Sequence, residues 1–358
     1  MKKIIILLLS FIILCSLAAC GQQNSVAENT AEATAPETTA AEPTTSAELE
    51  ETIRSHDFEG VIYAVRDGKV IAAYADGKLE SGEDITIDAS MPIGSVSKQF
   101  CAAAVMLLQD QGKLSVNDKL DKYYPDYPES GRITLHDLLS MRSGIPELTE
   151  ESGADVTLEH TEEENLSAIK QWVFSQKLTF EPGSTFAYAN INYLLLSDIV
   201  SQVSGKRYID FLRDSFFTPL GMIHTGSIIE LADDPAWAQG AVYNQVDAQP
   251  GLTNGCGDII SNAADITLWL NALSDGRAVS AESYNAMTAE HSSGEGYGYG
   301  MYTDIDGGVG HYGAIGIYSA FDYIDTDKNF TLFAVSNTIY PPEINGLAED
   351  LLTDLLME

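Results

Sequence analysis

Met91-Pro-Ile-Gly-Ser-Val-Ser-Lys-Gln-Phe100 runs directly into the apolar segment Cys101-Ala-Ala-Ala-Val-Met-Leu-Leu108. This pattern predicts a turn that leads into a helix over 97–112. Ser95 and Lys98 would then share one face of the helix start, with the lysine amine beside the serine hydroxyl. A serine hydroxyl is a weak nucleophile at neutral pH unless a neighbouring group takes its proton. The amides at the helix start add positive potential near the reacting oxygen, so the stretch predicts a nucleophilic serine.

The Ser-x-x-Lys spacing is not decisive by itself, because short motifs recur by chance. Ser167-Ala-Ile-Lys170 has the same spacing, but it follows the acidic run Glu162-Glu-Glu164 in a polar helical pattern. We interpret that copy as a solvent-exposed helix face. The assignment of Ser95 therefore depends on residues further along the chain.

A second element is Phe186-Ala-Tyr-Ala-Asn190. Tyr188 and Asn190 are two apart, so they point the same way in an extended or loop backbone. A phenol can move a proton if a nearby cation lowers its pKa, and an amide can bridge the lysine and a substrate carbonyl. Taken alone, the pair fits an aromatic residue on a cleft wall beside a turn asparagine.

A third element is Gly310-His-Tyr-Gly-Ala314, just before a strand pattern over 316–324. Gly313 would let a substrate lie against the strand edge. The backbone amide of Ala314, together with that of Ser95, would form an oxyanion hole, in which one donor is worth about 3–4 kcal/mol.

His224-Thr-Gly226 is superficially similar to the third element, but no strand pattern follows it. We assign His224 a structural role and prefer His311 as the functional histidine. For His311 alone, a structural role fits equally well.

The fold is predicted from strands at both ends of the chain. The patterns 61–65 and 70–74 flank Asp67-Gly68, a hairpin signal. Strand patterns return at 297–302, 316–324 and 330–336, and 347–356 resembles a closing helix. Between them lie helical patterns at 97–112, 133–141, 166–174, 191–203, 208–217 and 263–273. We expect one sheet built from both ends and covered by helices, with a helical lobe inserted and a cleft between them.

The N-terminus predicts a lipoprotein signal over residues 1–19. Lys2 and Lys3 precede an apolar run from Ile4 to Ala19, which ends in Leu17-Ala-Ala-Cys20. Cys20 would become the lipid-bearing first residue of the mature protein, outside the cytoplasm and anchored to the bacterial membrane. An uncleaved anchor, or an ordinary signal with an incidental cysteine, is the alternative.

Residues 20–50 predict a disordered acidic linker rich in Ala, Thr, Glu and Pro, followed by a folded domain over 51–358. The formal net charge of −34 argues against nucleic-acid binding and against membrane contact other than through a tether. Cys101 and Cys256 fit two small buried residues, although the sequence leaves their pairing open.

Together the three elements resemble the penicillin-recognising serine hydrolases, in the branch with class C β-lactamases, serine D-alanyl-D-alanine carboxypeptidases and related esterases. That family's pattern is Ser-x-x-Lys, then Tyr-x-Asn, then Lys or His followed by x-Gly. The similarity extends through 133–146, 180–186, 192–196, 218–222 and 255–265. It implies an α/β (α+β) fold of the β-lactamase/transpeptidase type, an antiparallel sheet flanked by helices with an inserted all-helical lobe. This agrees with the fold expected from the patterns.

The resemblance also implies the chemistry. It implies an exported serine hydrolase that forms an acyl-enzyme on amide or ester bonds of cell-wall peptides or related small molecules, with neither metal nor cofactor. Its residues would be Ser95, Lys98 and Tyr188 for catalysis, and Asn190, His311, Gly313 and Ala314 for the substrate and its oxyanion. Which of Lys98 and Tyr188 is the base stays open, as does the oligomeric state. A class C-like β-lactamase and a non-hydrolytic muropeptide-binding lipoprotein are the alternatives.

Two positions depart from the family pattern. Residue 311 is His instead of Lys, and His is often neutral at pH 7. Residue 312 is Tyr where a small hydroxyl residue is usual, and we expect its bulk to obstruct a substrate carboxylate. Both departures weaken the β-lactamase and carboxypeptidase readings and leave esterase or D-amino-acid amidase activity open. Asp325-x-Asp327-x-Asn329 lacks the glycine and distal glutamate of a calcium loop and is interpreted as a hairpin turn.

Overall fold

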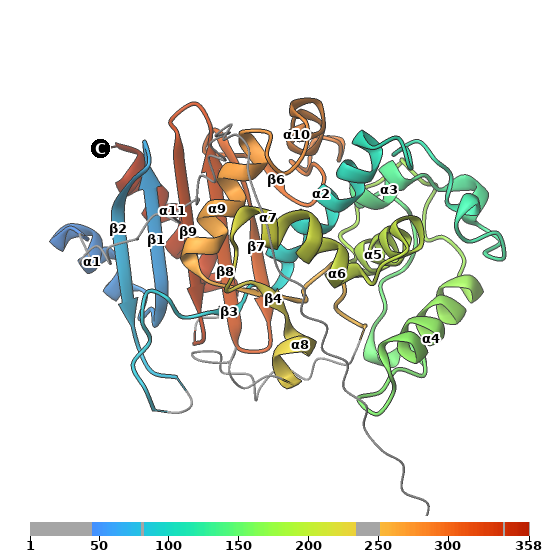
Figure 1. Ribbon diagram of the computed structural model, residues 1–358, viewed down its shortest axis with the longest axis horizontal. Helices are drawn as coiled ribbons and strands as arrows, with labels where there is room; N and C mark the ends of the chain where they lie inside the picture. Colours follow the sequence, from blue (N-terminus) through green and yellow to red (C-terminus); the bar gives the residue numbers. More distant parts are fainter. Residues whose placement is uncertain (1–44, 80–81, 234–250, 339–340, 358) are drawn as a thin grey trace, which may run out of the picture. The chain divides into compact units, whose positions relative to one another are not determined.

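A six-stranded antiparallel sheet forms the centre of the computed structural model, which describes residues 45–79, 82–233, 251–338 and 341–357. The strand order is β2-β1-β9-β8-β7-β6, so the first two strands of the chain pair with the last ones. This confirms the sheet expected from both ends of the sequence (Figure 1). The strands are β1 (Gly60–Arg66), β2 (Lys69–Asp76), β6 (Tyr302–Ile305), β7 (Gly308–Ile315), β8 (Tyr318–Asp325) and β9 (Phe330–Ser336).

The β1–β2 hairpin forms as the sequence predicts. Asp67 and Gly68 both have positive φ, 51° and 70°, the conformation that a tight two-residue hairpin turn requires. On its other side β1 pairs with β9 along its whole length, from Gly60 opposite Ser336 to Arg66 opposite Phe330. The N-terminal hairpin is therefore joined to the C-terminal strands through β1.

Helices cover both faces of the sheet, and the alternation of side chains along each strand gives each face its own core. Val61 packs on the face of α2 (Ser97–Asp110) and α9 (Ala263–Ser274). Its neighbour Ile62 packs on the opposite face, under α1 (Ala47–Ser55) and α11 (Pro341–Met357). Figure 1 shows α9 in front of the sheet and α11 behind it.

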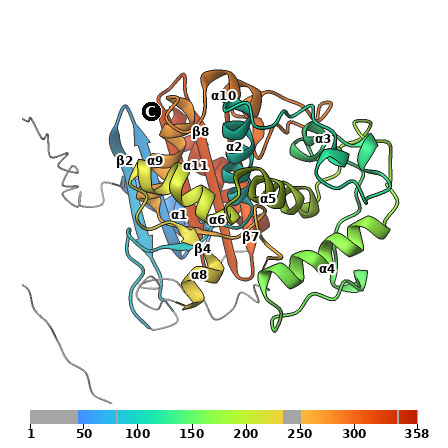
Figure 2. The same cartoon turned by 45° about the vertical axis from the view of Figure 1, so that its right-hand side comes forward.

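The middle of the chain forms the predicted helical lobe, which lies beside the sheet (Figure 2). Its helices include α3 (Leu135–Leu139), α4 (Glu162–Ser175) and α5 (Asn190–Ser204), and α5 packs against α2. Besides short 3-10 turns, the other elements are α6 (Tyr208–Leu212), the π-helical turn Arg213–Phe217, α7 (Thr218–Leu220), α8 (Ile228–Asp233), α10 (Ala281–Thr288) and a small sheet of β3 (Met91–Pro92), β5 (Ile259–Ser261) and β4 (Gly226–Ser227).

The last part of the sheet differs from the sequence prediction. The predicted strand over 297–302 is wrong, because β6 begins only at Tyr302. Gly298 and Gly300 instead bring the loop against the carbonyls of Met287 and Lys98, where a Cβ would lie 2.1 and 2.6 Å away. Conversely, β7 was not predicted as a strand, since its glycines have low strand propensity.

The structure bears on only one of the N-terminal predictions, the start of the folded domain. Helix α1 begins at Ala47, ahead of the predicted domain boundary at residue 51, and Ser46 caps it by accepting the Leu49 amide. The signal segment 1–19, Cys20 and the linker up to residue 44 lie outside the described residues. Within the described ranges, no helix is long and apolar enough to cross a membrane.

Strand β7 reaches the Ser95 turn only because residue 313 is glycine. A Cβ on Gly313 would lie 2.0 Å from the Ile93 carbonyl oxygen, so Gly313→Ala must push β7 away from the turn. We expect this variant to lose about 1–3 kcal/mol of unfolding free energy, together with most of its activity. Denaturant unfolding and a hydrolysis assay measure both.

The matched control is Gly346→Ala in the middle of α11. A Cβ there meets the His56 ring at 3.6 Å, an ordinary contact. Because alanine favours the helix over glycine by about 1 kcal/mol, this variant should be as stable as the wild type or more so. Equal losses in the two variants would contradict the close approach assigned to Gly313.

Candidate active site

Ser95 lies on the short 3-10 turn Gly94–Val96 that leads into α2. Gly94 has a φ of 50°, and a Cβ on it would lie 2.6 Å from the Ala314 amide nitrogen. Strand β6 pairs with β7 only as far as Gly310, so the next residues of β7 face the turn instead. The fold thus brings the backbone of Ala314 against that of Ser95, as an oxyanion hole requires. That their two amides bind an oxyanion stays a prediction.

A buried polar network fixes β7 and β8 to α2. The Gln99 side-chain amide donates to both Asp322 carboxylate oxygens at 2.8 Å, and the His311 backbone amide donates to the same carboxylate at 2.7 Å. Trp269 Nε1 donates to Gln99 Oε1 at 3.2 Å. Because Gln99 follows Lys98 directly, this network sets the position of His311 relative to the start of α2.

Lys98 is fully buried, and its amine contacts three oxygens. Nζ lies 2.9 Å from Ser95 Oγ, 2.8 Å from Asn190 Oδ1 and 2.7 Å from the Cys256 carbonyl oxygen. An ammonium has three N–H donors, so all three are used. Burial lowers the pKa of Lys98 to about 8, although the nearby Cys256 and Glu147 oppose the shift. A useful fraction of neutral amine therefore exists near neutral pH.

The contacts also orient that neutral amine. Asn190 Oδ1 and the Cys256 carbonyl oxygen can only accept hydrogen bonds, so they retain two of the Lys98 N–H groups. The third position of the amine faces Ser95 Oγ. When Lys98 loses its proton, the lone pair is therefore directed at the Ser95 hydroxyl, which is the geometry of a general base.

Tyr188 completes this group of catalytic candidates. Its hydroxyl hydrogen-bonds to the Ser95 side chain, and its ring centre lies 4.9 Å from Lys98 Nζ. The residue is 36% exposed, yet burial around its hydroxyl end raises the pKa of Tyr188 well above that of a free phenol. The condition of a pKa lowered by a nearby cation is therefore not met at Tyr188. Tyr188 thus stays protonated at neutral pH and can relay a proton but does not begin as a phenolate.

His311 lies beside the other two groups, with its ring centre 6.2 Å from that of Tyr188. Nδ1 donates to the Tyr312 carbonyl oxygen at 2.5 Å, and Nε2 lies 3.2 Å from the Tyr297 hydroxyl, which donates to it. Burial lowers the pKa of His311 to about 3, and the charge of Lys98 adds to the effect. His311 is therefore neutral at pH 7 and offers no positive charge to a substrate carboxylate.

The Tyr312 side chain does not lie at the substrate site, where the sequence analysis expects it. Its ring packs on Phe321, with the centres 4.8 Å apart, in the core between the sheet and α11. Ser95 and α2 lie on the other face of the sheet. The predicted obstruction of the substrate by the Tyr312 phenol is therefore wrong, because neighbouring side chains of a strand alternate between faces.

Sequence reasoning missed two contributors to the site. The Cys256 carbonyl oxygen binds Lys98, and a backbone carbonyl leaves no mark in the sequence. Glu147 accepts the backbone amide of Asn190, at a position that no motif marked. Cys101 and Cys256 are both free and buried, as expected of two small core residues.

The other candidate residues lie apart from this site. His224 is held structurally, since its backbone amide donates to Asp265 Oδ2 at 2.7 Å. Within the described ranges, no group of three or more His, Cys, Asp or Glu side chains could hold a metal ion. The Asp325 carboxylate accepts the Lys328 amide at 3.0 Å and pairs with the Lys328 amine at 2.9 Å, which confirms the turn interpretation.

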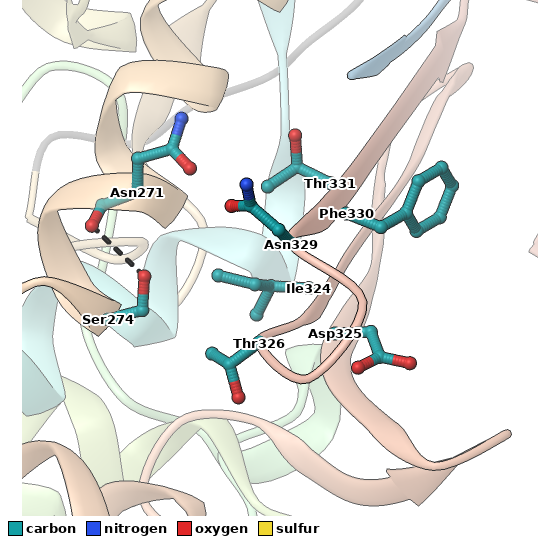
Figure 3. Close-up of a pocket in the computed structure, with 8 residues that line it drawn as sticks. All are labelled: Asn271, Ser274, Ile324, Asp325, Thr326, Asn329, Phe330 and Thr331. Carbon is teal, nitrogen blue, oxygen red and sulfur yellow. Dashed lines mark hydrogen bonds between the residues drawn. The ribbon is translucent and has the colours of Figure 1, made fainter. Parts of the chain in front are cut away.

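A cavity of about 190 Å³ lies between the end of α9 and the turn that joins β8 to β9 (Figure 3). Asn271 and Ser274 line it on the helix side, and Asn329 and Thr331 on the side of the sheet. The Asp325 side chain points away from α9 in this view. None of the lining residues belongs to the Ser95 site, so the cavity is separate from the chemistry.

The chain is similar to several known proteins in sequence and in fold. One relative is PbpX of Bacillus subtilis (strain 168), which is described as a penicillin-binding protein. It is 30% identical to this chain over 75% of this chain and 67% of its own length. A D-aminopeptidase of Brucella anthropi is 29% identical over 78% of this chain but only 56% of its own length. The solved structure of an octameric penicillin-binding protein homologue from Pyrococcus abyssi has a TM-score of 0.71 at 26% identity, covering 87% of this chain and 77% of its own.

A family model described as Beta-lactamase matches residues 44–356, almost the whole of the chain that the structure describes. The sheet with its inserted helical lobe is the fold of that family, and the match extends through all three motifs. The chain belongs to the beta-lactamase family and is a serine hydrolase.

Proposed function

We propose that this protein is an exported hydrolase that cleaves amide or ester bonds of cell-wall peptides or related small molecules through an acyl-enzyme on Ser95. One observation carries the proposal. The Ser95 hydroxyl contacts both a buried amine with a pKa of about 8 and the hydroxyl of Tyr188. A nucleophile with a base and a proton relay is the arrangement that acyl transfer needs.

We expect the protons to move between these three side chains. Ser95 Oγ bonds to the substrate carbonyl carbon while its proton passes to Lys98 Nζ, 2.9 Å away. The bond to the leaving group then breaks as that group takes the proton back from Lys98 by way of Tyr188. Water attacks the resulting ester, gives one proton to Lys98, and Ser95 departs with that proton. The amides of Ser95 and Ala314 stabilise the oxygen anion in both halves.

The neutral His311 narrows the substrate class. A penicillin or a D-alanyl-D-alanine terminus presents a free carboxylate, which a cationic residue at this position would attract. Burial keeps the His311 ring uncharged at neutral pH, so that attraction is absent here. The similarity to a D-aminopeptidase points the same way, toward an amidase or esterase. We therefore place D-amino-acid amides and esters ahead of β-lactams as substrates.

The direct test uses a p-nitrophenyl ester, a D-amino-acid p-nitroanilide and a fluorescent penicillin, each with wild type and Ser95→Ala. We expect hydrolysis of the ester or anilide that falls about a thousandfold or more in Ser95→Ala, because the nucleophile is gone. Absorbance at the nitrophenol or nitroaniline band follows the reaction.

The other outcomes assign the alternatives. Fast turnover of the penicillin, with little on the ester or anilide, would make the protein a β-lactamase. Rates equal in wild type and Ser95→Ala for all three probes would overturn the acyl-enzyme and leave a muropeptide-binding protein.

The dependence of kcat/KM on pH should report Lys98. Its amine accepts the Ser95 proton only when neutral, and burial lowers its pKa to about 8. We expect kcat/KM to rise close to tenfold per unit below that pH and to level off above about 9. His311 titrates near pH 3 and adds no step in this range. A profile that is flat from pH 6 to pH 9 would contradict Lys98 as the base.

Export and anchoring are part of the proposal, supported by Leu17-Ala-Ala-Cys20 at the end of the apolar run. If Cys20 carries the lipid, a bacterium expressing the chain should incorporate labelled palmitate into it. Cys20→Ala should abolish the label and release the protein from the membrane fraction. Membrane retention of Cys20→Ala would instead indicate an uncleaved anchor. Cys15→Ala, within the same apolar run, serves as the control that keeps the label.

A further inference from the structure

Glu147 holds the start of α5, the helix that presents Asn190. Its Oε2 accepts the Asn190 backbone amide, and Oε1 accepts the Leu148 amide at 3.0 Å. The residue before the helix, Ala189, gives no side-chain cap, so the Glu147 carboxylate does what a cap would do. The first residue of α5 is therefore fixed by a negative charge at the positive end of the helix.

Asp258 plays a parallel part in the loop that carries Cys256. The residue is 1% exposed, and its Oδ1 accepts the Gly255 amide at 3.0 Å. Gly255 has a φ of 73°, and a Cβ on it would lie 2.8 Å from the Tyr193 carbonyl oxygen, so the loop packs tightly on α5. Since Gly255 immediately precedes Cys256, this contact fixes the direction of the Cys256 carbonyl.

The two carboxylates thus hold the two acceptors of the Lys98 amine, one on each side. Asn190 Oδ1 and the Cys256 carbonyl oxygen are the groups that keep two Lys98 N–H bonds in place. We propose that Glu147 and Asp258 are positioning residues that aim the Lys98 lone pair at Ser95 and set the charge around it. The inference rests on the proposed function, since it concerns the base of that reaction.

Glu147 and Asp258 act on Lys98 through their charge as well as through the acceptors that they hold in place. The titratable groups that face its amine are Tyr188, Tyr193, His311, Cys101, Cys256, Glu147 and Asp258. Of these, the two carboxyl groups supply negative charge when they are ionised, which favours the ammonium and opposes the effect of burial on the pKa of Lys98. Burial raises the pKa of Glu147 and raises that of Asp258 to about 7, so Asp258 is mostly ionised only as the pH approaches the pKa of Lys98. If either negative charge is removed, less opposes the effect of burial, so the pKa of Lys98 should fall below about 8.

Glu147→Gln and Asp258→Asn remove the charge but keep one acceptor oxygen each. In Glu147→Gln that oxygen can accept only one of the two amides, Asn190 and Leu148, that the carboxylate binds. We expect the midpoint of the pH profile to move down by about half a unit to one unit in each variant. Glu147→Ala and Asp258→Ala also lose the acceptor, so kcat should fall about tenfold or more while KM stays within about threefold. A fluorophosphonate that labels activated serines gives the profile without knowledge of the natural substrate.

Asp265→Asn is the matched control. Asp265 is also buried, at 2% exposed, and also holds a loop, through the His224 amide and the Thr225 hydroxyl at 2.7 and 2.8 Å. It supports neither of the Lys98 acceptors, so its variant should keep the wild-type midpoint. Thermal unfolding of every variant shows which of them fold.

The outcomes are distinguishable. Midpoints that stay at the wild-type value in both Glu147→Gln and Asp258→Asn, or that move equally in Asp265→Asn, would overturn the inference alone. A wild-type protein that the fluorophosphonate labels no faster than Ser95→Ala would overturn the proposed function, and the inference with it. Downward shifts confined to Glu147→Gln and Asp258→Asn would support the positioning role.

Discussion

Burial of the Lys98 amine is the constraint that organises this molecule. An amine removed from water is costly unless each of its N–H groups finds an acceptor. The chain meets that requirement from three separate segments, since Ser95 precedes α2, Asn190 begins α5, and Cys256 lies in the loop before β5. Satisfying one side chain therefore joins the sheet, the helical lobe and the loop between them.

The same exclusion of water acts on every titratable group of the site. It lowers the pKa of Lys98 and of His311, and it raises the pKa of Tyr188. Each shift favours the neutral form of its group. Because the pKa of Lys98 is about 8, most of its amine is still protonated at pH 7, beside a neutral imidazole and a neutral phenol. The smaller neutral fraction can accept a proton along the short contact to Ser95. Burial also raises the pKa of Glu147, and that of Asp258 to about 7, while backbone amides bind both carboxyl groups.

Much of this arrangement could be predicted from local signals in the sequence. The apolar run after Ser95 predicts α2, and Asp67-Gly68 predicts the first hairpin, because each depends on neighbouring residues. Strand β7 could not be predicted that way. Its glycines have low strand propensity. They are explained only by the close approach of distant backbone, such as the Ile93 carbonyl near Gly313, which leaves no room for a Cβ. Likewise, the face on which Tyr312 packs follows from the register of β7 against β8, which no local pattern reveals.

The position of β1 has a consequence for how the chain assembles. This strand is made early, yet its second neighbour is β9, whose pairing runs from Gly60 opposite Ser336 to Arg66 opposite Phe330. Until the final strands have been synthesised, one edge of the first hairpin keeps its backbone groups unsatisfied and open to other chains. Such distant pairing is slow to form. Completion of the sheet must therefore wait until β9 has been synthesised, and the open edge of β1 is exposed to aggregation until then.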